Sequence, residues 1–278
     1  MAVKITNVSI GDDSTIWTVD SKQRIWGRVA RGSKWDEIKD ASAIQVSVAR
    51  GDQIWVLNAQ GILYKREGTS WAINRLQQPV IHVSAGSDGT VYAIDQNQSL
   101  WFRTHVDPNW KKDPAAKAVQ INVASKDKIW GLTANGDIYQ KTKDGWSKKV
   151  PQSGALSLSV GSDGEVWYVG GDTKSYRLAG STWVQVTDRP MMQISVRDAT
   201  EVWGVTIAGE LWQWLNGLWR KTEHPAFTAG KTYIVSRGDT LSGIALKLSI
   251  PYTALRRANP QIVNPDRIEV GQVINLPE

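Results

Sequence analysis

The sequence predicts a mainly β fold for most of the chain, followed by a small domain of two strands and two helices. Two observations lead to this prediction. Fourteen of the 15 tryptophans among the 278 residues fall into three columns of a unit that recurs every 36 to 38 residues. After Trp219 there is no further tryptophan, and the residues follow a different pattern. The chain is therefore expected to hold a large repeat domain and a short, unrelated one.

Each repeat places aromatic residues at fixed distances from a small polar residue. The six starting positions are Ser9, Ser47, Ser84, Asn122, Ser159 and Ser195. Eight residues after each comes the first column, which is Trp17, Trp55, Tyr92, Trp130, Trp167 and Trp203. Nine residues further comes the second column, which is Trp26, Tyr64, Trp101, Tyr139, Tyr176 and Trp212. A third column, spaced less strictly, is Trp35, Trp71, Trp110, Trp146, Trp183 and Trp219.

Each unit predicts four short antiparallel strands. The fifth copy shows them as LSLSVG, EVWYVG, SYRLAG and WVQV, separated by turns that contain Gly, Asp or Ser. Short strands bounded by such residues are typical of β-hairpins. Six four-stranded units at this period predict a six-bladed β-propeller over residues 1–222, because a closed ring lets every sheet pack both faces on its neighbours. The sixth copy has a full set of strands, which favours closure without a strand from the N-terminus, although the sequence alone leaves this open.

A weaker alternation distinguishes odd from even copies. Two residues after the starting position, the first, third and fifth copies have Gly11, Gly86 and Gly161. The even copies have other residues there, namely Ala49, Ala124 and Arg197. We interpret this as a pair of blades repeated three times, so a ligand site between blades could recur three times as readily as six.

These repeats resemble tectonin repeats, most clearly over Val83 to Tyr92 and Leu158 to Trp167. The resemblance extends from residue 4 to about residue 222. It implies a six-bladed propeller lectin similar to those of slime mould, horseshoe crab and fungi, which bind bacterial or nematode surface glycans. Candidate partners are thus cell-surface glycans, O-methylated sugars and lipopolysaccharide among them. Other tectonin-repeat proteins are interaction platforms in intracellular trafficking, so the fold alone does not decide the function.

The three columns carry different expectations. The first two lie in the middle of strands and are expected to form the core between blades. The third column lies nearer the rim, and its six tryptophans are the candidate glycan-binding residues of the propeller, because sugar C–H groups pack on aromatic faces; inter-blade packing is the alternative. Two residues after the second column come four cations, for which we expect cation–π packing or donation to sugar hydroxyls and phosphates. These cations are Arg28, Arg66, Arg103 and Lys141.

The C-terminal residues predict a βααβ domain over 231–278, after a short linker over 223–230. Residues 232–235 resemble a strand, and Thr240 is a plausible N-cap for a helix whose apolar face holds Leu241, Ile244, Ala245 and Leu248. Pro251 suits the start of a second helix. Residues 273–276 are expected to return as a strand.

This segment resembles a LysM domain, on Gly238-Asp239-Thr240-Leu241, Ala258-Asn259-Pro260 and Gly271-Gln272-x-Ile274-x-Leu276-Pro277. The resemblance implies binding of N-acetylglucosamine chains, that is peptidoglycan or chitin oligosaccharides, between two loops. We expect backbone groups there to bind the N-acetyl amide, with Ile262, Pro265 and Ile268 in apolar contact; for 238–241, helix capping alone is the alternative. The implied site is Gly238, Asp239, Thr240, Leu241, Ser242, Ile262, Asn264, Pro265, Asp266, Arg267 and Ile268.

Together the two parts predict a non-enzymatic, multivalent carbohydrate-binding protein with no catalytic residues, metal or cofactor. A scaffold or adaptor of a wall-anchored secretion or injection apparatus, with a propeller that binds protein, is the main alternative. A glycosidase is less favoured, because acids such as Asp12, Asp88 and Asp163 fall in repeat turns where turn formation accounts for them.

Composition narrows the function further. The absence of cysteine excludes disulfides and thiolate zinc sites, and three dispersed histidines make a histidine metal site unexpected. A net charge of +6 without a basic stripe argues against nucleic-acid binding. No apolar run predicts membrane insertion, and the first residues do not resemble a signal peptide. We therefore expect a cytoplasmic protein, or one released by a non-classical route to act at cell surfaces.

Overall fold

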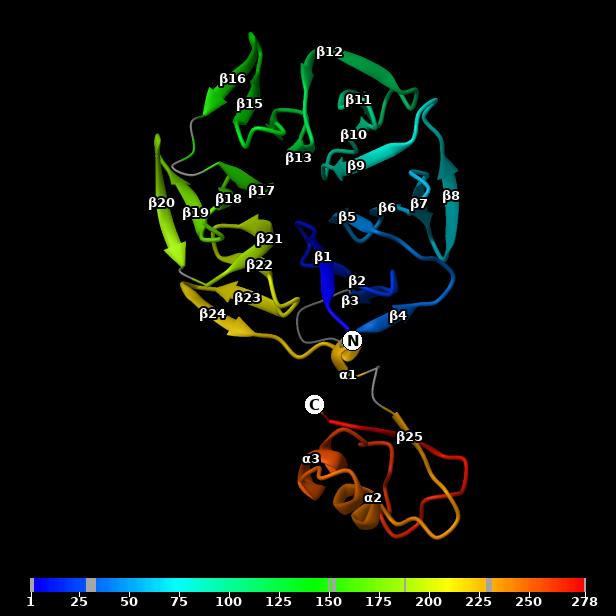
Figure 1. Ribbon diagram of the computed structural model, residues 1–278. Helices are drawn as coiled ribbons and strands as arrows, with labels where there is room; N and C mark the ends of the chain where they lie inside the picture. Colours follow the sequence, from blue (N-terminus) through cyan, green and yellow to red (C-terminus); the bar gives the residue numbers. More distant parts are fainter. Residues whose placement is uncertain are drawn as a thin grey trace. The chain divides into compact units, whose positions relative to one another are not determined.

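The computed structural model describes residues 3–28, 34–149, 151, 154–187, 189–228 and 232–277. The chain divides into two compact units, one over Ile5–Thr222 and one that contains Glu223–Glu278. The first unit is a ring of six four-stranded sheets (Figure 1). The six-bladed β-propeller predicted from the repeats is therefore confirmed. No helix in the described part of the chain has the length and apolar character needed to cross a membrane.

Each blade is a meander whose strands pair in chain order, from the channel outward. The first two blades are β1 (Ile5–Ile10), β2 (Ile16–Asp20), β3 (Ile25–Arg28), β4 (Asp36–Ile38) and β5 (Gln45–Arg50), β6 (Gln53–Leu57), β7 (Leu63–Glu67), β8 (Ser70–Asn74). The next two are β9 (Val80–Ala85), β10 (Val91–Asp95), β11 (Ser99–Arg103), β12 (Lys111–Lys117) and β13 (Gln120–Ser125), β14 (Lys128–Leu132), β15 (Ile138–Thr142), β16 (Gly145–Lys149). The last two are β17 (Ala155–Val160), β18 (Val166–Gly170), β19 (Ser175–Ala179), β20 (Thr182–Thr187) and β21 (Met191–Asp198), β22 (Glu201–Thr206), β23 (Leu211–Leu215), β24 (Leu218–Lys221).

The propeller core lies between blades. First-column aromatics are on the second strand of each blade and are all buried; Trp55, Trp167 and Trp203 are among the largest fully buried side chains. Aromatic side chains of this size each bury roughly 150–250 Å². The expectation that this column forms inter-blade core is confirmed. In the second column Trp26 and Tyr176 are buried, whereas Tyr64 and Tyr139 are half-buried.

The starting serine of each repeat joins its blade to the next. Its Oγ accepts a hydrogen bond from a backbone N–H on the innermost strand of the following blade, at 2.8–3.0 Å. In the fourth copy Asn122 replaces the serine, and its buried Nδ2 has no hydrogen-bond partner. The bond from Ile10 N–H to Ser195 links the last blade to the first, so the ring closes as the other blades join. The five pairs are Ser9–Val48, Ser47–Ala85, Ser84–Val123, Ser159–Val196 and Ser195–Ile10.

Two kinds of blade junction alternate around the ring. After each even blade, a glutamine side chain bonds both N–H and C=O of one residue on the next inner strand, as Gln120 does with Leu158. After each odd blade, a turn residue donates its N–H to the next blade, as Ser87 does to Ala124. A Cβ on Gly86 would lie 3.0 Å from the Ala124 carbonyl oxygen, so this junction needs glycine. The predicted repetition of blade pairs is thus confirmed. The even-blade glutamines are Gln45, Gln120 and Gln193.

The second unit has the predicted βααβ order. β25 (Thr232–Ile234) pairs with β26 (Val273–Asn275), and α2 (Leu241–Lys247) and α3 (Tyr252–Arg257) lie between them in sequence. Thr240 caps α2 by accepting the Gly243 N–H. A short helix, α1 (Pro225–Thr228), lies within the predicted linker, whose residues 229–230 are outside the described part.

A small apolar core and one buried amide hold this domain together. Leu241, Ile244, Leu255 and Ile274 are at most 1% exposed. Asn259 donates to the backbone oxygens of Leu255 and Asn275, and its Oδ1 accepts the Asn275 N–H. The side chain of Asn259 therefore joins the end of α3 to β26, which fixes the loop between them at both ends.

Loss of one inter-blade serine is expected to destabilise the propeller, since a buried N–H is left without an acceptor. Ser84→Ala should lower the free energy of unfolding by about 1–3 kcal/mol. Asn122→Ser, which supplies the missing hydroxyl, should raise it or leave it unchanged. Urea unfolding followed by tryptophan fluorescence measures this in the propeller, because every tryptophan precedes residue 220. A Ser84→Ala protein as stable as the parent would contradict the role of the serines.

Candidate functional site

The first loop of the C-terminal domain is held in place by Asp239. Its Oδ2 accepts hydrogen bonds from the Tyr233 hydroxyl and the Ser236 N–H, both at 2.7 Å. These bonds hold the pKa of Asp239 below its usual value, and Lys247, which donates to the Tyr233 hydroxyl, adds to the effect. Gly238 has a φ of 89°, a conformation that favours glycine. Gly238, Thr240 and Ser242 are exposed, so the loop is preformed and open to a ligand.

The second loop follows α3 and corrects part of the predicted site. Ile262 is 5% exposed and belongs to the small core, so its predicted contact with a sugar is wrong, and Leu241 is likewise buried. Ile268 is half-buried against the same core. Val263, which sequence reasoning missed, is 90% exposed in this loop. An apolar residue next to a buried isoleucine is the signal that could have identified it.

The remaining predicted residues form the outer part of the second loop. Asn264 Oδ1 accepts the Asp266 N–H at 3.0 Å, and its carbonyl accepts the Arg267 N–H. Asn264, Asp266 and Arg267 are exposed, and Pro265 is half-buried. The loop is therefore a compact turn that presents an apolar side chain and polar groups together.

Third-column tryptophans of the propeller pack between blades. Trp71 meets Trp17 of the preceding blade edge to face at 6.1 Å, and Trp110 meets Trp55 at 6.3 Å. Trp183 is 5% exposed. The Nε1 atoms of Trp110, Trp146 and Trp219 are buried, so they are not presented to a sugar. Trp35 and Trp219 contact Trp203 and Trp167 in the same way.

The four cations after the second column also belong to these junctions. The Arg103 guanidinium lies 5.5 Å from the Trp55 ring and 5.8 Å from the Trp110 ring. Lys141 packs in the same way on Tyr92 and Trp146 and donates to Asp113. Burial opposes its charge, but hydrogen bonds to Asp113 and Tyr92 hold the pKa of Lys141 above its usual value. Cation–π packing, one of the two expectations, is confirmed.

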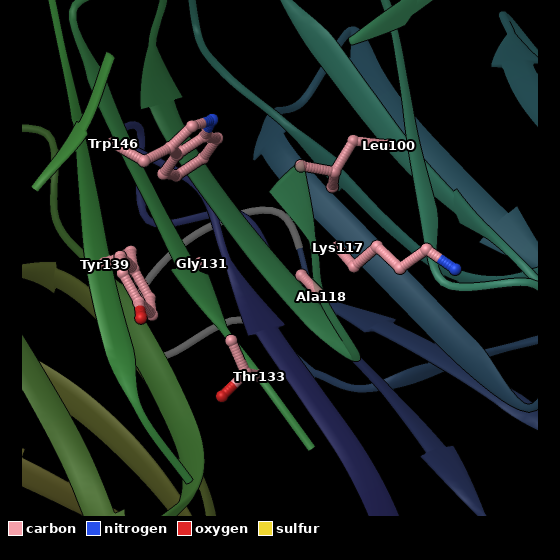
Figure 2. A pocket seen from close by; sticks show the side chains of 7 residues that line it. All are labelled: Leu100, Lys117, Ala118, Gly131, Thr133, Tyr139 and Trp146. Atoms are coloured by element: carbon pink, nitrogen blue, oxygen red, sulfur yellow. The ribbon is translucent and has the colours of Figure 1, made fainter. Parts of the chain in front are cut away.

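A cavity of about 250 Å³ opens between the third and fourth blades. Figure 2 shows Trp146 and Tyr139 on one side of it and Leu100 on the other, with Ala118, Gly131 and Thr133 between and the Lys117 side chain pointing away from the two aromatic rings. Of the predicted glycan-binding tryptophans, Trp146 lines this cavity. The cavity is smaller than the roughly 300–1,000 Å³ of drug-sized ligand pockets, which suits a single sugar ring.

The cavity exists because two small residues coincide in the fourth copy. Ala118 and Gly131 leave its wall open. In the sixth copy the residue equivalent to Gly131 is also a glycine, Gly204. There the Met191 side chain fills the space, since it lies 3.2 Å from the point where a Cβ on Gly204 would be. In the fifth copy the equivalent residue is Tyr168, whose ring contacts Trp183 at 4.7 Å. Neither the aromatic columns nor the turns predict such a difference between copies.

Turn carboxylates of the propeller are used in its construction. Asp88 Oδ1 accepts the Thr90 N–H, and Oδ2 accepts the Lys126 N–H of the next blade. Asp163 does the same with Glu165 and Ala199. In the first blade Asp13 makes these two bonds, with Thr15 and Gly51. The sequence pattern indicated its neighbour Asp12 for this role. The predicted turn role of these acids is confirmed.

The buried histidine His82 belongs to a blade junction. Burial lowers the pKa of His82 to about 4, so this histidine is neutral at pH 7. Its Nε2 lies 3.1 Å from the Gln45 amide in the junction between the second and third blades. Within the described ranges no three His, Asp or Glu side chains are grouped as metal ligands would be. A cavity of about 40 Å³ on the channel axis, lined by all six blades, is too small for a sugar.

Family models match both parts of the chain. The model for the Tectonin domain matches three times, over residues 1–75, 70–157 and 154–228, which agrees with a pair of blades as the repeated unit. The chain belongs to the Tectonin-domain family. A LysM domain model matches residues 233–277. The tectonin propeller is thus joined to a C-terminal LysM domain.

Two curated proteins are similar to this chain in its LysM region. An endolysin of Bacillus phage B103 is 44% identical over 57 residues, which is 20% of this chain and 22% of the endolysin. The secreted LysM effector ECP6 of Passalora fulva is 46% identical over 46 residues, 16% of this chain and 20% of the effector. The chain thus spans about a fifth of the curated relatives it matches.

Among solved structures, YCF48 from Cyanidioschyzon merolae has a TM-score of 0.52 at 12% identity, covering 84% of this chain and 90% of the other. At this identity the likeness concerns the propeller fold alone.

The Lys141–Asp113 pair gives a test of the junction between the third and fourth blades. Lys141→Leu, which introduces the type of residue found at the equivalent Leu178, should destabilise the propeller by about 3–5 kcal/mol, since Asp113 is left buried without its cation. The double variant Lys141→Leu/Asp113→Asn should recover most of this loss. Thermal unfolding by tryptophan fluorescence measures both. Equal losses of stability in the two variants would show that the packing of the Lys141 side chain, and not its charge, stabilises this junction.

Proposed function

We propose that this protein is a non-enzymatic lectin that binds two carbohydrates on one cell surface. The LysM domain binds an N-acetylglucosamine polysaccharide, either peptidoglycan or chitin. The propeller binds a second surface glycan in the cavity between its third and fourth blades. Because such ligands lie outside cells, the proposal places the working protein at a cell surface.

The observation that carries the proposal is the preformed pair of LysM loops. Hydrogen bonds of Asp239 and Asn259 hold the two loops in place, while Gly238, Thr240 and Val263 in these loops are exposed. Preformed loops lose little conformational entropy on binding. Exposed backbone groups next to an apolar side chain suit an N-acetyl group, which has an amide and a methyl.

The propeller cavity supports a second, different sugar. Trp146 and Tyr139 supply aromatic surface, and the hydroxyls of Thr133 and Tyr139 supply hydrogen-bonding groups (Figure 2). An aromatic surface with a few convergent polar groups is the usual composition of a small-molecule site. The cavity replaces the predicted rim of six tryptophans as the site that we propose, because those side chains pack between blades.

Avidity is the mechanism that we propose for strong attachment. A single sugar site with a Kd near 1 mM contributes only about −4 kcal/mol. Two sites on one chain meet their surface at an effective concentration in the millimolar range, and this can strengthen attachment by roughly 10²–10⁴. The advantage arises only when both glycans occur on the same surface.

The LysM site is tested by replacing its exposed valine. Val263→Asp should weaken binding of the full chain to chitopentaose about tenfold or more, because it removes apolar contact and adds a charge at the loop. Leu246→Asp is the matched control, since Leu246 is 83% exposed on α2, outside both loops. Isothermal titration calorimetry measures both. An equal effect of the two substitutions, or none, would contradict the placement of the site.

The propeller site is tested by filling the cavity from within. Ala118→Met introduces the residue that the sixth blade has at the equivalent position, Met191. On a glycan array, this variant should lose binding to the glycans that the parent propeller binds. Val80→Met adds bulk at the equivalent position of the third blade and should leave binding intact. Both proteins are first compared by thermal unfolding. If the propeller bound no glycan on the array and a protein partner were recovered instead, the scaffold function would be favoured over the lectin function.

A further inference from the structure

An apolar residue recurs at an exposed position near the start of the innermost strands. It lies three residues before the starting position of each repeat and is apolar in five of the six copies. The large side chains of Ile44, Ile81, Leu156 and Met192 are 40–59% exposed, whereas Val119 is half-buried. A single exposed apolar residue needs no explanation, but its recurrence at one position of the repeat does. The six residues are Thr6, Ile44, Ile81, Val119, Leu156 and Met192.

The backbone holds this position in the same way in every copy. The preceding residue donates its N–H to a carbonyl oxygen in a turn of the neighbouring blade, at 2.8–3.1 Å. In the first, third, fifth and sixth blades the pairing with the second strand then shifts, and the exposed residue has no partner opposite it. Such a β-bulge re-aims a side chain, so the exposure is built into the backbone. The six donors are Ile5, Ala43, Val80, Ala118, Ala155 and Met191.

These six residues surround one end of the central channel. Val46 donates to Asn7 and Val48 donates to Ser9, so the first two innermost strands run in the same direction at the same level. Equivalent bonds repeat this alignment between the other innermost strands around the ring (Figure 1). We call the six residues the channel ring.

Three exposed cations lie in the loops at the same end. Because strands alternate in direction, the turn between the second and third strands and the link to the next blade are at the end where the innermost strand begins. Lys22 lies in such a turn, next to Gln23, whose carbonyl accepts the Ala43 N–H. Lys39 and Arg75 lie in the first two links. Among the described residues none of these three cations forms an ion pair.

Acidic side chains at this end have partners of their own. Asp172 accepts the Tyr176 hydroxyl at 2.6 Å, and the buried Asp95 accepts the Trp101 Nε1–H. The other acids in the described turns and links form ion pairs, namely Asp20 with Arg24, Asp40 with Arg66, Asp137 with Lys148 and Glu210 with Lys221. The charge that remains around the channel ring is therefore mainly positive, and it favours an anionic partner.

We propose that this end of the propeller docks on an anionic lipid surface. The channel ring enters the boundary between headgroups and acyl chains, and Lys22, Lys39 and Arg75 contact lipid phosphates. A second copy of the chain is a poorer occupant, because two such ends would bring like charges together. The members of the ring are 36 to 38 residues apart in the sequence, so they form no apolar run. This attachment goes beyond the proposed function and does not depend on the sugar sites.

The apolar contribution is tested by flotation of the full chain with vesicles. The protein should bind an equal mixture of phosphatidylcholine and phosphatidylglycerol. Leu156→Gln/Met192→Gln should weaken this binding about tenfold, because two apolar side chains no longer leave water. Ile73→Gln/Val184→Gln is the matched control, since it makes the same change at exposed residues of the outer strands β8 and β20 and should leave binding unchanged.

The cations are tested with the same vesicles. The parent chain should bind vesicles of phosphatidylcholine alone about tenfold more weakly, and high salt should reduce the difference. Lys39→Gln/Arg75→Gln should remove most of the preference for the anionic mixture. Lys126→Gln/Lys143→Gln removes two exposed charges from turns at the opposite end of the blades and should retain the preference. Thermal unfolding of each variant checks that its fold is intact.

Three results would overturn the proposal. The first is failure of the parent chain to bind either kind of vesicle. The second is an equal loss of binding in the channel-ring variant and its matched control. The third is a dimer, detected by light scattering, or a captured protein that is lost in Leu156→Gln/Met192→Gln and kept in Ile73→Gln/Val184→Gln, because the channel ring would then be a protein interface.

Discussion

The propeller depends on hydrogen-bond acceptors for the backbone N–H groups at the inner edge of each blade. An innermost strand has no further strand beside it, and its buried N–H groups would be costly without acceptors. The preceding blade supplies those acceptors from side chains, chiefly the Oγ of the starting serine. Because Ser195 serves Ile10 as Ser9 serves Val48, the ring closes by the same bond that joins its other blades. In five of the six repeats one hydroxyl therefore satisfies an inner edge and joins two blades, and the bond from Ile10 to Ser195 closes the ring.

The proposed site lies where the repeat is least regular. Asn122 in the fourth copy gives up the serine bond, and Ala118 and Gly131 in the same copy leave a cavity that Met191 and Tyr168 occupy in other blades. The remaining bonds at these junctions, from Ser84 on one side and Gln120 on the other, keep the irregular blade in place. The missing serine bond and the cavity lie on opposite sides of this blade: Asn122 faces the fifth blade, whereas the cavity lies at the junction with the third blade, which keeps the Ser84 bond.

Much of this architecture could be predicted from the sequence because it repeats. Three aromatic columns indicated six blades, and the glycines at 11, 86 and 161 indicated the pairing that the Gly86–Ala124 contact explains. The cavity could not be predicted in this way, since it depends on the summed volume of Ala118 and Gly131, which meet only after folding. The burial of Ile262 and exposure of Val263 likewise depend on which side of one loop faces the core. A repeat pattern predicts the features that all copies share, whereas the cavity and the exposed Val263 depend on residues particular to one copy or one loop.

The location of the cavity changes how multivalency arises. Six equivalent rim sites would let the propeller hold one kind of glycan by itself, at any surface dense enough in that sugar. Met191 and Tyr168 fill the equivalent places in two blades, so the repeat does not supply a ring of identical sites. Under the proposed function, strong attachment requires the LysM loops and the cavity between the third and fourth blades to be occupied together, by different sugars. A lectin of the proposed kind would distinguish surfaces by the coincidence of two glycans, and each site could remain weak without loss of selectivity.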